Sequence, residues 1–340
     1  MKDIDYSKII KRSWEITKKN KWLWVVGVVI AAFGGGSGSG GGGGGSSSST
    51  STTLPSQSPA PIPVEDIKDK TSYVLGIATD SLQNWLSNFP AINWFVIGVV
   101  IFLVILFGTV VIWILTSWAK GALIQGLEDA DNEKEVTLKS ISPYGISNIK
   151  KIIIFGLIST GMTLLVLFGA LIAVGLGFLI YSFAGSSSTI LLVLLGILLA
   201  FVFIIIIAIF TMVSTYAERL MVLKGLSPWE AWKKGFSLSK GNFFPTFIMG
   251  IINGFIGFSV GCLGMIALLI LFAIPGFLII YPIFKDGFNM PSASQIFAII
   301  VLFFLLGSIN MAIRAVFTVF NYGNWNLFFK QIIDKEEKQI

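Results

Sequence analysis

The sequence contains no histidine, one cysteine and few charged residues, and each shortage excludes a class of protein. Without histidine, the chain lacks the side chain that most often serves as a general base or a metal ligand. Cys262 alone can form neither an internal disulfide nor a Cys-His pair. Charged residues make up 12% of the chain, against roughly 25% in soluble proteins, while 54% of residues are hydrophobic. This composition indicates an integral membrane protein.

Carboxylate clusters are the remaining candidates for catalysis or metal binding. They occur at Glu128, Asp129 and Asp131 and again at Glu336 and Glu337. Both clusters lie in charged stretches, which favours solvated surfaces over a metal site. We therefore expect no enzyme activity, no cofactor and no metal site.

Long apolar runs define the fold class. Five charge-free runs each exceed the roughly 20 residues that a helix needs to cross a bilayer. They cover residues 91–118, 152–183, 188–217, 241–284 and 287–313. A sixth apolar run at 22–33 supplies only about 18 Å of helix, so it needs its flanking glycines to cross. We predict an all-α membrane protein, a single transmembrane domain over 1–340, with six transmembrane helices in three hairpins.

The run at 22–33 has a second interpretation, as the apolar part of a cleaved signal peptide. The stretch Lys18–Lys21 would then be the positively charged region that precedes it. The region before it argues against this, because Tyr6, Ile10 and Trp14 recur at helical spacing and indicate a helix lying in the membrane interface.

Lysine and arginine residues orient the chain. With six crossings and the N-terminus inside, only Lys68, Lys70 and Lys285 lie outside, and Arg314 lies within the last apolar run. All others of the 24 Lys and Arg residues lie inside, which predicts a cell-membrane protein with both termini in the cytoplasm. Because these cations are spread over four segments, they indicate orientation and not nucleic-acid binding.

The Gly-, Ser-, Thr- and Pro-rich stretch at 34–63 is predicted to be a disordered external loop within the domain. It contains G-x-G-x-x-G, but no Lys-Ser/Thr follows to make a nucleotide-binding loop. Its drift in composition, without a repeating unit, favours a natural loop over an engineered linker. The following segment, 64–89, has an apolar face at helical spacing and is expected to rest on the outer interface or to cap the bundle.

A further interfacial helix is predicted after residue 226. Ser227 is a typical N-cap, Pro228 suits the first helical position, and Glu230 completes a capping box. The helix either is a plain interfacial linker or binds lipid headgroups. The candidate headgroup contacts are Trp229, Trp232, Lys233 and Lys234, with Phe236 on the aromatic face.

Three parts of the sequence resemble one another. "KRSWEITKKN" (11–20) aligns with "KKGFSLSKGN" (233–242), and each precedes an outward crossing. "YGISNIKKIIIFGLI", from residue 144, is a weaker third copy. These similarities predict an internal repeat of three helical hairpins, each introduced by an interfacial segment.

The stretches "AERLMVLKGLSPWEAWKKGFSLSKGNFF" (217–244) and "IIKRSWEITKKN" (9–20) resemble the cytoplasmic motifs of the multi-pass membrane domain of glycerophosphodiester phosphodiesterases, which also has stand-alone, uncharacterised relatives. In that family, hydrolysis belongs to a soluble barrel with histidine and metal-binding carboxylates. Since this chain has no histidine, the resemblance implies a membrane module and not a phosphodiesterase.

Five glycines in the run at 241–284 recur at alternating spacings of four and three, which places them on one helical face suited to close helix packing. They are Gly250, Gly254, Gly257, Gly261 and Gly264. The alternative is a substrate groove against bare backbone. Pro275 and Pro282 predict that this long run is kinked or partly re-entrant.

Arg314 is a charged residue within the last apolar segment, and Asn310 lies one helical turn before it. Charged residues in the membrane usually face the bundle interior and pair, so we predict a contact between Arg314 and Glu218. Alternatively, Arg314 extends to the headgroups. The sequence thus favours a non-enzymatic protein that binds or organises envelope lipid, or a partner protein. The alternative is a transporter of a small solute or lipid, with Asn253, Asn310, Arg314 and the glycine face along its path.

Overall fold

The computed structural model describes residues 4–34, 91–184, 189–285 and 292–337, and all regular secondary structure in these ranges is α-helical. The expected loop at 34–63, apart from Gly34, and the expected amphipathic segment at 64–89 lie outside the described residues. The chain divides into two units. The first unit comprises Met1–Gly43 and Ile112–Ile340, and the second unit comprises Gly44–Val111.

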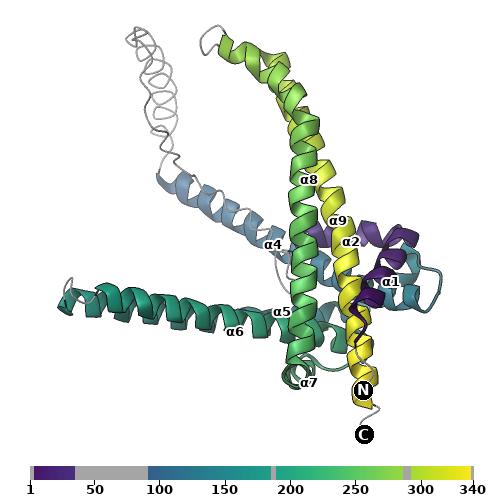
Figure 1. Cartoon of the computed structure of the whole chain (residues 1–340). Coiled ribbons are helices and arrows are strands. Elements are labelled where there is room, and N and C mark those ends of the chain that lie inside the picture. The colour runs from purple at the N-terminus through teal and green to yellow at the C-terminus, as the bar shows by residue number, and fades with distance from the viewer. Residues whose placement is uncertain (1–3, 35–90, 185–188, 286–291, 338–340) are drawn as a thin grey trace. The chain divides into compact units, whose positions relative to one another are not determined.

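Figure 1 shows the helices of the part of the chain that the structure describes. They are α1 (Tyr6–Lys19), α2 (Trp22–Phe33), α4 (Ala91–Asp131), α5 (Leu138–Ala184), α6 (Thr189–Leu223), α7 (Pro228–Gly241), α8 (Phe243–Lys285) and α9 (Ala293–Glu337). In the second unit, the described part is the first half of α4, a continuous apolar helix. The second half of α4 belongs to the first unit with the other seven helices.

Five of the described helices, α4, α5, α6, α8 and α9, are long and apolar enough to cross a membrane. The most apolar part of each is not buried within the protein, as expected for surfaces that contact lipid. Helix α2 has 12 residues, too few to span a hydrocarbon core of about 30 Å. The chain therefore has the fold of a multi-pass helical membrane protein.

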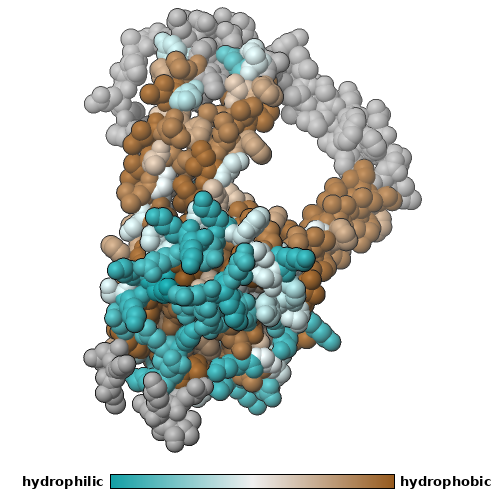
Figure 2. Space-filling model, turned by 90° about the vertical axis from the view of Figure 1, so that its right-hand side faces the viewer, coloured by the Kyte–Doolittle hydropathy of each residue, from teal (hydrophilic) through white to brown (hydrophobic). Residues whose placement is uncertain are grey.

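The buried residues of the first unit gather where the last turns of α4, α6 and α9 meet the first turns of α5 and α8. We call this region the packed end. Two clusters of buried apolar side chains fill it, one centred on Leu220 and Phe328 and the other on Leu23 and Leu123. Figure 2 shows hydrophilic side chains over this end and hydrophobic side chains along the helices beyond it.

The short helices α1 and α7 each begin at a residue whose side chain caps the helix. Asp5 accepts the amide N–H of Lys8 at 2.9 Å. Ser227 caps α7, and Glu230 completes the capping box, which confirms the predicted start of this helix. Because both short helices are capped and amphipathic, their apolar faces are available to pack on the longer helices.

Helix α1 packs against α9 through a face next to the predicted one. Ile9, Ser13 and Ile16 are buried, and the Ser13 hydroxyl donates to the Phe320 carbonyl at 2.8 Å. Trp14 is 52% exposed. Both aromatic residues of the predicted face still contact α9, because the ring of Tyr6 stacks on Phe328 and that of Trp14 meets Phe320 edge-on, with centroids 6.3 and 5.9 Å apart.

The aligned segments of the sequence share one local geometry. The side-chain amide of Asn20 donates to the carbonyl of Ile16, and that of Asn242 donates to the carbonyl of Leu238, in each case four residues earlier at the end of a short helix. Asn148 makes the same bond to Tyr144 within α5. A long or apolar helix follows both terminal asparagines, as the repeat predicts.

Helix α8 runs without interruption through Pro275 and Gly276. The predicted re-entrant break is therefore wrong, although the helix curves toward its C-terminal end in Figure 1. Transmembrane helices tolerate proline because neighbouring helices and local adjustments compensate for the lost hydrogen bond.

Candidate functional site

A buried ion pair joins α4 to α6. The ammonium of Lys120 lies 2.6 Å from Oε1 of Glu218, and both residues are less than a tenth exposed. The predicted contact between Arg314 and Glu218 is therefore wrong. Arg314 is exposed on α9 and donates from Nε to Oδ1 of Asn310 at 3.0 Å.

The pairing of Glu218 with Lys120 could not be predicted from the sequence, for a physical reason. Lys120 follows directly after an apolar run, so it resembles a loop residue that ends a crossing. In the structure α4 continues to Asp131, and the extra turns bring Lys120 between the helices, where Glu218 lies. A buried charge needs such a partner, because leaving water is costly for an isolated ion.

Arg219 is a second buried cation beside this pair. It is 2% exposed, and it donates to the backbone carbonyls of Thr215 at 2.7 Å and Tyr322 at 3.4 Å. Its guanidinium also lies 5.6 Å from the ring centroid of Tyr322. The Nε atom of Arg219 has no hydrogen-bond partner in the structure.

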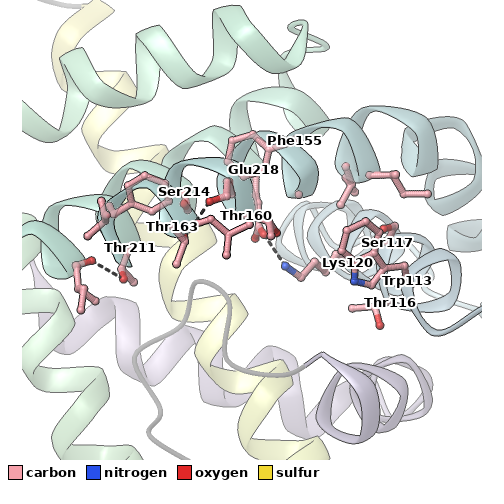
Figure 3. Close-up of a pocket in the computed structure, with 18 of the residues that line it drawn as sticks. Trp113, Thr116, Ser117, Lys120, Phe155, Thr160, Thr163, Thr211, Ser214 and Glu218 are labelled. Carbon is pink, nitrogen blue, oxygen red and sulfur yellow. Dashed lines mark hydrogen bonds and ion pairs between the residues drawn. The ribbon is translucent and has the colours of Figure 1, made fainter. Parts of the chain in front are cut away.

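The Lys120–Glu218 pair lies at one end of a cavity of about 650 Å³ between α4, α5 and α6. Trp113, Phe155 and Phe210 are aromatic parts of its wall. Figure 3 shows the two charged side chains pointing toward one another among the residues of the lining. Hydroxyl side chains come from all three helices, among them Thr116, Ser117, Ser159, Thr163, Thr211 and Ser214.

Most of the bonded hydroxyls in the lining are turned back onto their own helix. Thr116, Thr163 and Thr211 each donate to the carbonyl four residues earlier, at 2.8 to 2.9 Å. The buried Oγ of Ser159 differs, because it has no partner. The Ser159 hydroxyl is thus a donor in the lining that a bound molecule could satisfy.

Exposure changes along the cavity. At the charged end Ile152 and Phe155 are buried, whereas Leu164 and Ile207 in the lining are 60% and 58% exposed. The cavity therefore combines a polar, enclosed end with an apolar, open end. This is the pattern of a site for an amphiphilic molecule, since pockets of about 300–1,000 Å³ with a few placed polar groups typically hold small ligands.

Other predicted site residues lie elsewhere and do not form one site. Asn253 is buried between α8 and α9, where its Oδ1 accepts from Asn324 Nδ2 at 2.7 Å. Asn310 and Arg314 are exposed on α9. The residues expected to line a transport path therefore form two separate pairs.

The predicted glycine face packs closely at only some of its positions. A Cβ atom at Gly257 would lie 2.9 Å from the ring of Phe317, so α9 approaches α8 there, and Gly264 lies near Ile313. Gly250 and Gly261 have no atom within 4 Å of such a Cβ. The prediction of a continuous packing face is thus wrong for these two glycines, because α9 contacts α8 over a narrower strip.

The candidate headgroup residues of α7 divide between two surfaces. Lys233 and Lys234 are exposed, and the Lys233 ammonium lies 5.5 Å from the ring centroid of the exposed Trp229. Trp232 instead packs on Phe155 and Phe210, with ring centroids 5.9 and 4.9 Å away. Its assignment as a headgroup contact is therefore corrected.

The first acidic cluster is not a solvated face as expected. Lys330 of α9 contacts Glu128 at 3.1 Å and Asp131 at 2.9 Å, and Arg12 of α1 also contacts Asp131 at 3.2 Å. These pairs tie both terminal helices to the end of α4. Among the residues the structure describes, no group of three or more acidic, cysteine or histidine side chains could hold a metal ion.

The neighbouring Asp129 is buried and contacts Lys134 at 3.1 Å. The hydrogen bond and the negative charge of Asp129 raise the pKa of Lys134. In α7, the hydroxyl and amide of Ser227 lower the pKa of the Glu230 carboxyl. Both pKa shifts favour the charged form, that of Lys134 just after the end of α4 and that of Glu230 at the start of α7.

No family model, curated protein or solved structure matches the chain. The fold and the cavity therefore carry the functional argument. They define a multi-pass helical membrane protein with an amphiphilic cavity between three of its helices.

Proposed function

We propose that this chain is a non-enzymatic protein of the cell membrane that binds a membrane lipid in the cavity between α4, α5 and α6. The single observation that carries this proposal is the gradient along the cavity, from a buried ion pair to exposed apolar side chains. A lipid has the same gradient from headgroup to acyl chain. The packed end then surrounds the headgroup, and the apolar lengths of α5 and α6 contact the chains.

We further propose six crossings in three hairpins, with the packed end facing the cytoplasm. The positive residues support this orientation, because Lys and Arg are enriched in cytoplasmic segments. Helices α1 and α7 each precede an outward helix and carry exposed lysines. In this arrangement α2 begins the first crossing.

The exposed side of α7 supports a second, weaker contact with lipid. Trp229 is 51% exposed, and Lys233 lies against its ring. Aromatic residues with adjacent lysines are typical of helices at headgroup depth. This surface would orient the packed end on the membrane, while the cavity would select the bound molecule.

The resemblance of the segments 9–20 and 217–244 to the membrane domain of glycerophosphodiester phosphodiesterases also supports a membrane module. Both segments belong to the packed end, since α1 and α7 contribute to its buried clusters. We propose that this end organises lipid and carries no hydrolytic activity.

The test is native mass spectrometry of the full chain released from lipid nanodiscs, comparing two substitutions in α5. Gly156 lines the cavity, and a Cβ atom there meets nothing within 4 Å, so Gly156→Phe fills the cavity without a backbone clash. Gly161→Phe is the matched control, because Gly161 also has open space but does not line the cavity. We expect a discrete lipid adduct that Gly156→Phe removes and Gly161→Phe retains.

A lipid adduct that survives Gly156→Phe would contradict binding in this cavity. A stoichiometric bound protein with no lipid adduct would instead favour the organisation of a partner protein.

A further inference from the structure

The two short capped helices, α1 and α7, are equivalent to one another in the structure. Aligned by their shared sequence pattern, they begin at equivalent N-caps, Asp5 and Ser227, and end at equivalent C-caps, Asn20 and Asn242. Their buried residues also occupy the same aligned positions, which are Ile9, Ser13, Ile16 and Thr17 in α1 and Ala231, Gly235, Leu238 and Ser239 in α7. Both helices therefore turn the same side inward.

Because the inward sides coincide, the outward sides of α1 and α7 can be compared position by position. Exposed aligned positions such as Lys8 with Glu230 and Lys19 with Gly241 differ in chemistry. Three exposed positions keep their chemistry, namely Lys11 with Lys233, Trp14 with Phe236, and Lys18 with Lys240. Their spacing of three and then four residues places them on one helix face. We call this face of each helix the basic-aromatic stripe.

Each stripe places a half-exposed aromatic ring between two lysines. Trp14 and Phe236 are each 52% exposed. With the acidic residues of the described ranges, the four stripe lysines form no ion pair. In α7 the ring of Trp229 extends the stripe, with the Lys233 ammonium 5.5 Å from its centroid. Such a surface is complementary to a molecule that is apolar at one end and anionic at the other.

The stripes lie at the level where the lipid-facing surfaces begin. The apolar helices α2 and α8 follow α1 and α7 directly, and both open with exposed aromatic residues, Trp22 at 51% and Phe244 at 75%. The hydroxyl of Tyr6 donates to the carbonyl of Pro245 at 3.3 Å, which holds the start of α1 beside the start of α8. Lysines and aromatic residues at the ends of membrane helices are typical of headgroup depth.

We propose that the basic-aromatic stripes of α1 and α7 are two equivalent surfaces, each of which binds the phosphate of one anionic lipid of the cytoplasmic leaflet. This inference rests on the proposed function, in which the packed end faces the cytoplasm, and it names the class of headgroup. The two lysines of a stripe lie about 10 Å apart along the helix axis, and their long stems let both ammonium groups reach one headgroup. The aromatic ring between them then packs on the glycerol and the upper acyl chain.

The experiment places the full chain in nanodiscs of equal parts phosphatidylglycerol and phosphatidylcholine with identical acyl chains, and counts the retained lipids by native mass spectrometry. Lys11→Gln with Lys18→Gln neutralises the stripe of α1, and Lys233→Gln with Lys240→Gln that of α7. A lysine near an anionic surface is worth about five-fold in affinity, so each double substitution should lower phosphatidylglycerol affinity at its own stripe by about 25-fold.

The matched control is Lys8→Gln with Lys19→Gln. These lysines are also exposed on α1, so the same charge is removed, but neither lies on the stripe. Every comparison is repeated with Gly156→Phe added, which separates a lipid in the cavity from lipids on the stripes. We expect two retained phosphatidylglycerol molecules besides the cavity lipid, one after either stripe is neutralised, none after both, and two in the control.

That series would support the proposal, whether or not Gly156→Phe removes the cavity lipid. An equal loss in the control would overturn the stripes as the binding surfaces. The absence of any preference for phosphatidylglycerol, together with a cavity lipid that Gly156→Phe removes, would overturn this inference and leave the lipid-binding function standing.

Two further outcomes would replace the lipid by another anion. Inorganic phosphate, added at millimolar concentration in a parallel series, is the soluble source of the same chemistry. Its stripe-dependent binding, with no preference between the two lipids, would overturn the lipid source. A stoichiometric acidic protein that the stripe variants release, again without a lipid preference, would overturn the lipid in favour of a protein partner.

Discussion

Lys120 and Glu218 form a 2.6 Å ion pair across the interface of α4 and α6, and this pair closes the inner end of the cavity. The two residues are 98 positions apart in the chain. Their pairing fixes the relative position of the two helices, because neither charge can be buried without the other. The geometry of the cavity therefore depends on the fold and not on local sequence.

The first prediction concerns the stability of this pair. Lys120→Met leaves Glu218 buried without its cation and should lower the free energy of unfolding by about 3–5 kcal/mol. The double substitution Lys120→Met with Glu218→Met should recover part of that loss, because the carboxylate of Glu218 is no longer buried without Lys120, while Arg219 keeps its bonds to the carbonyls of Thr215 and Tyr322. Thermal unfolding in detergent, followed by circular dichroism, measures both changes.

Lys134→Met is a suitable control, since Lys134 is an exposed member of another pair. It should change the unfolding midpoint little. A single substitution at Lys120 with an effect as small as that at Lys134 would contradict the stabilising role of the buried pair.

The second prediction concerns the buried amide pair between α8 and α9. Asn253→Ala removes the 2.7 Å bond from Asn324 and should cost about 1 kcal/mol, a typical value for a hydrogen bond between membrane helices. Asn310→Ala removes an exposed bond to Arg314 and should cost less. Reversible unfolding in a titration with sodium dodecyl sulfate compares the two, and an equal or larger effect at Asn310 would refute the assignment.

The third prediction uses glycines with opposite surroundings. A Cβ atom at Gly27 would lie 2.7 Å from the carbonyl oxygen of Ala315 and from Val319, so Gly27→Ala should separate α2 from α9. Overpacking of this kind costs about 1–3 kcal/mol. Gly250→Ala, in open space, should be neutral or slightly stabilising, because alanine favours the helix.

Limited proteolysis of the N-terminal region measures the release of α2 directly. Faster cleavage in Gly27→Ala than in Gly250→Ala is expected. Identical cleavage rates would show that the contact between α2 and α9 does not hold the N-terminal helices.

The fourth prediction concerns pH and the cap of α7. The pKa of Glu230 is lowered in the folded chain by the hydrogen bonds from Ser227. Its contribution to stability is therefore fully present above the ordinary pKa of 4.5 and is lost as the pH falls through the lowered folded value. A carboxyl titration by nuclear magnetic resonance should show a pKa below 4.5, and Ser227→Ala should return it toward 4.5. An unchanged pKa in that variant would rule out the cap as the cause.

Local features of the structure could be predicted because they depend on neighbouring residues. Ser227, Pro228 and Glu230 define the start of α7 wherever the helix lies. The lengths of the apolar runs likewise identify the five long helices, since hydrocarbon thickness fixes the number of residues needed. The boundaries of the short apolar helix, Trp22–Phe33, also agree with the sequence.

The pairing of polar residues could not be predicted in the same way. Arg314 was the obvious partner for Glu218, because both were near one apolar boundary. Its rotation on α9 exposes it, while the continuation of α4 brings in Lys120. The depth of a residue in the membrane, as judged from the sequence, therefore did not predict which polar side chains contact one another.

Ser159 illustrates the same limit within the cavity. As a serine in an apolar run it gives no signal, because most hydroxyls in such helices bond to the carbonyl four residues earlier. Its lack of a partner becomes visible only once the side chains around it are placed. No pattern in the sequence distinguishes it from Thr163, which makes the usual bond.

The sequence by itself determined the class of protein, the five long apolar helices and the cap of α7, because hydrophobicity and capping act over a few turns of one chain segment. Tertiary structure alone decided which polar side chains meet and where a cavity opens. Those outcomes depend on the rotation of each helix about its axis and on the register between helices. Both are set by packing among residues far apart in the chain.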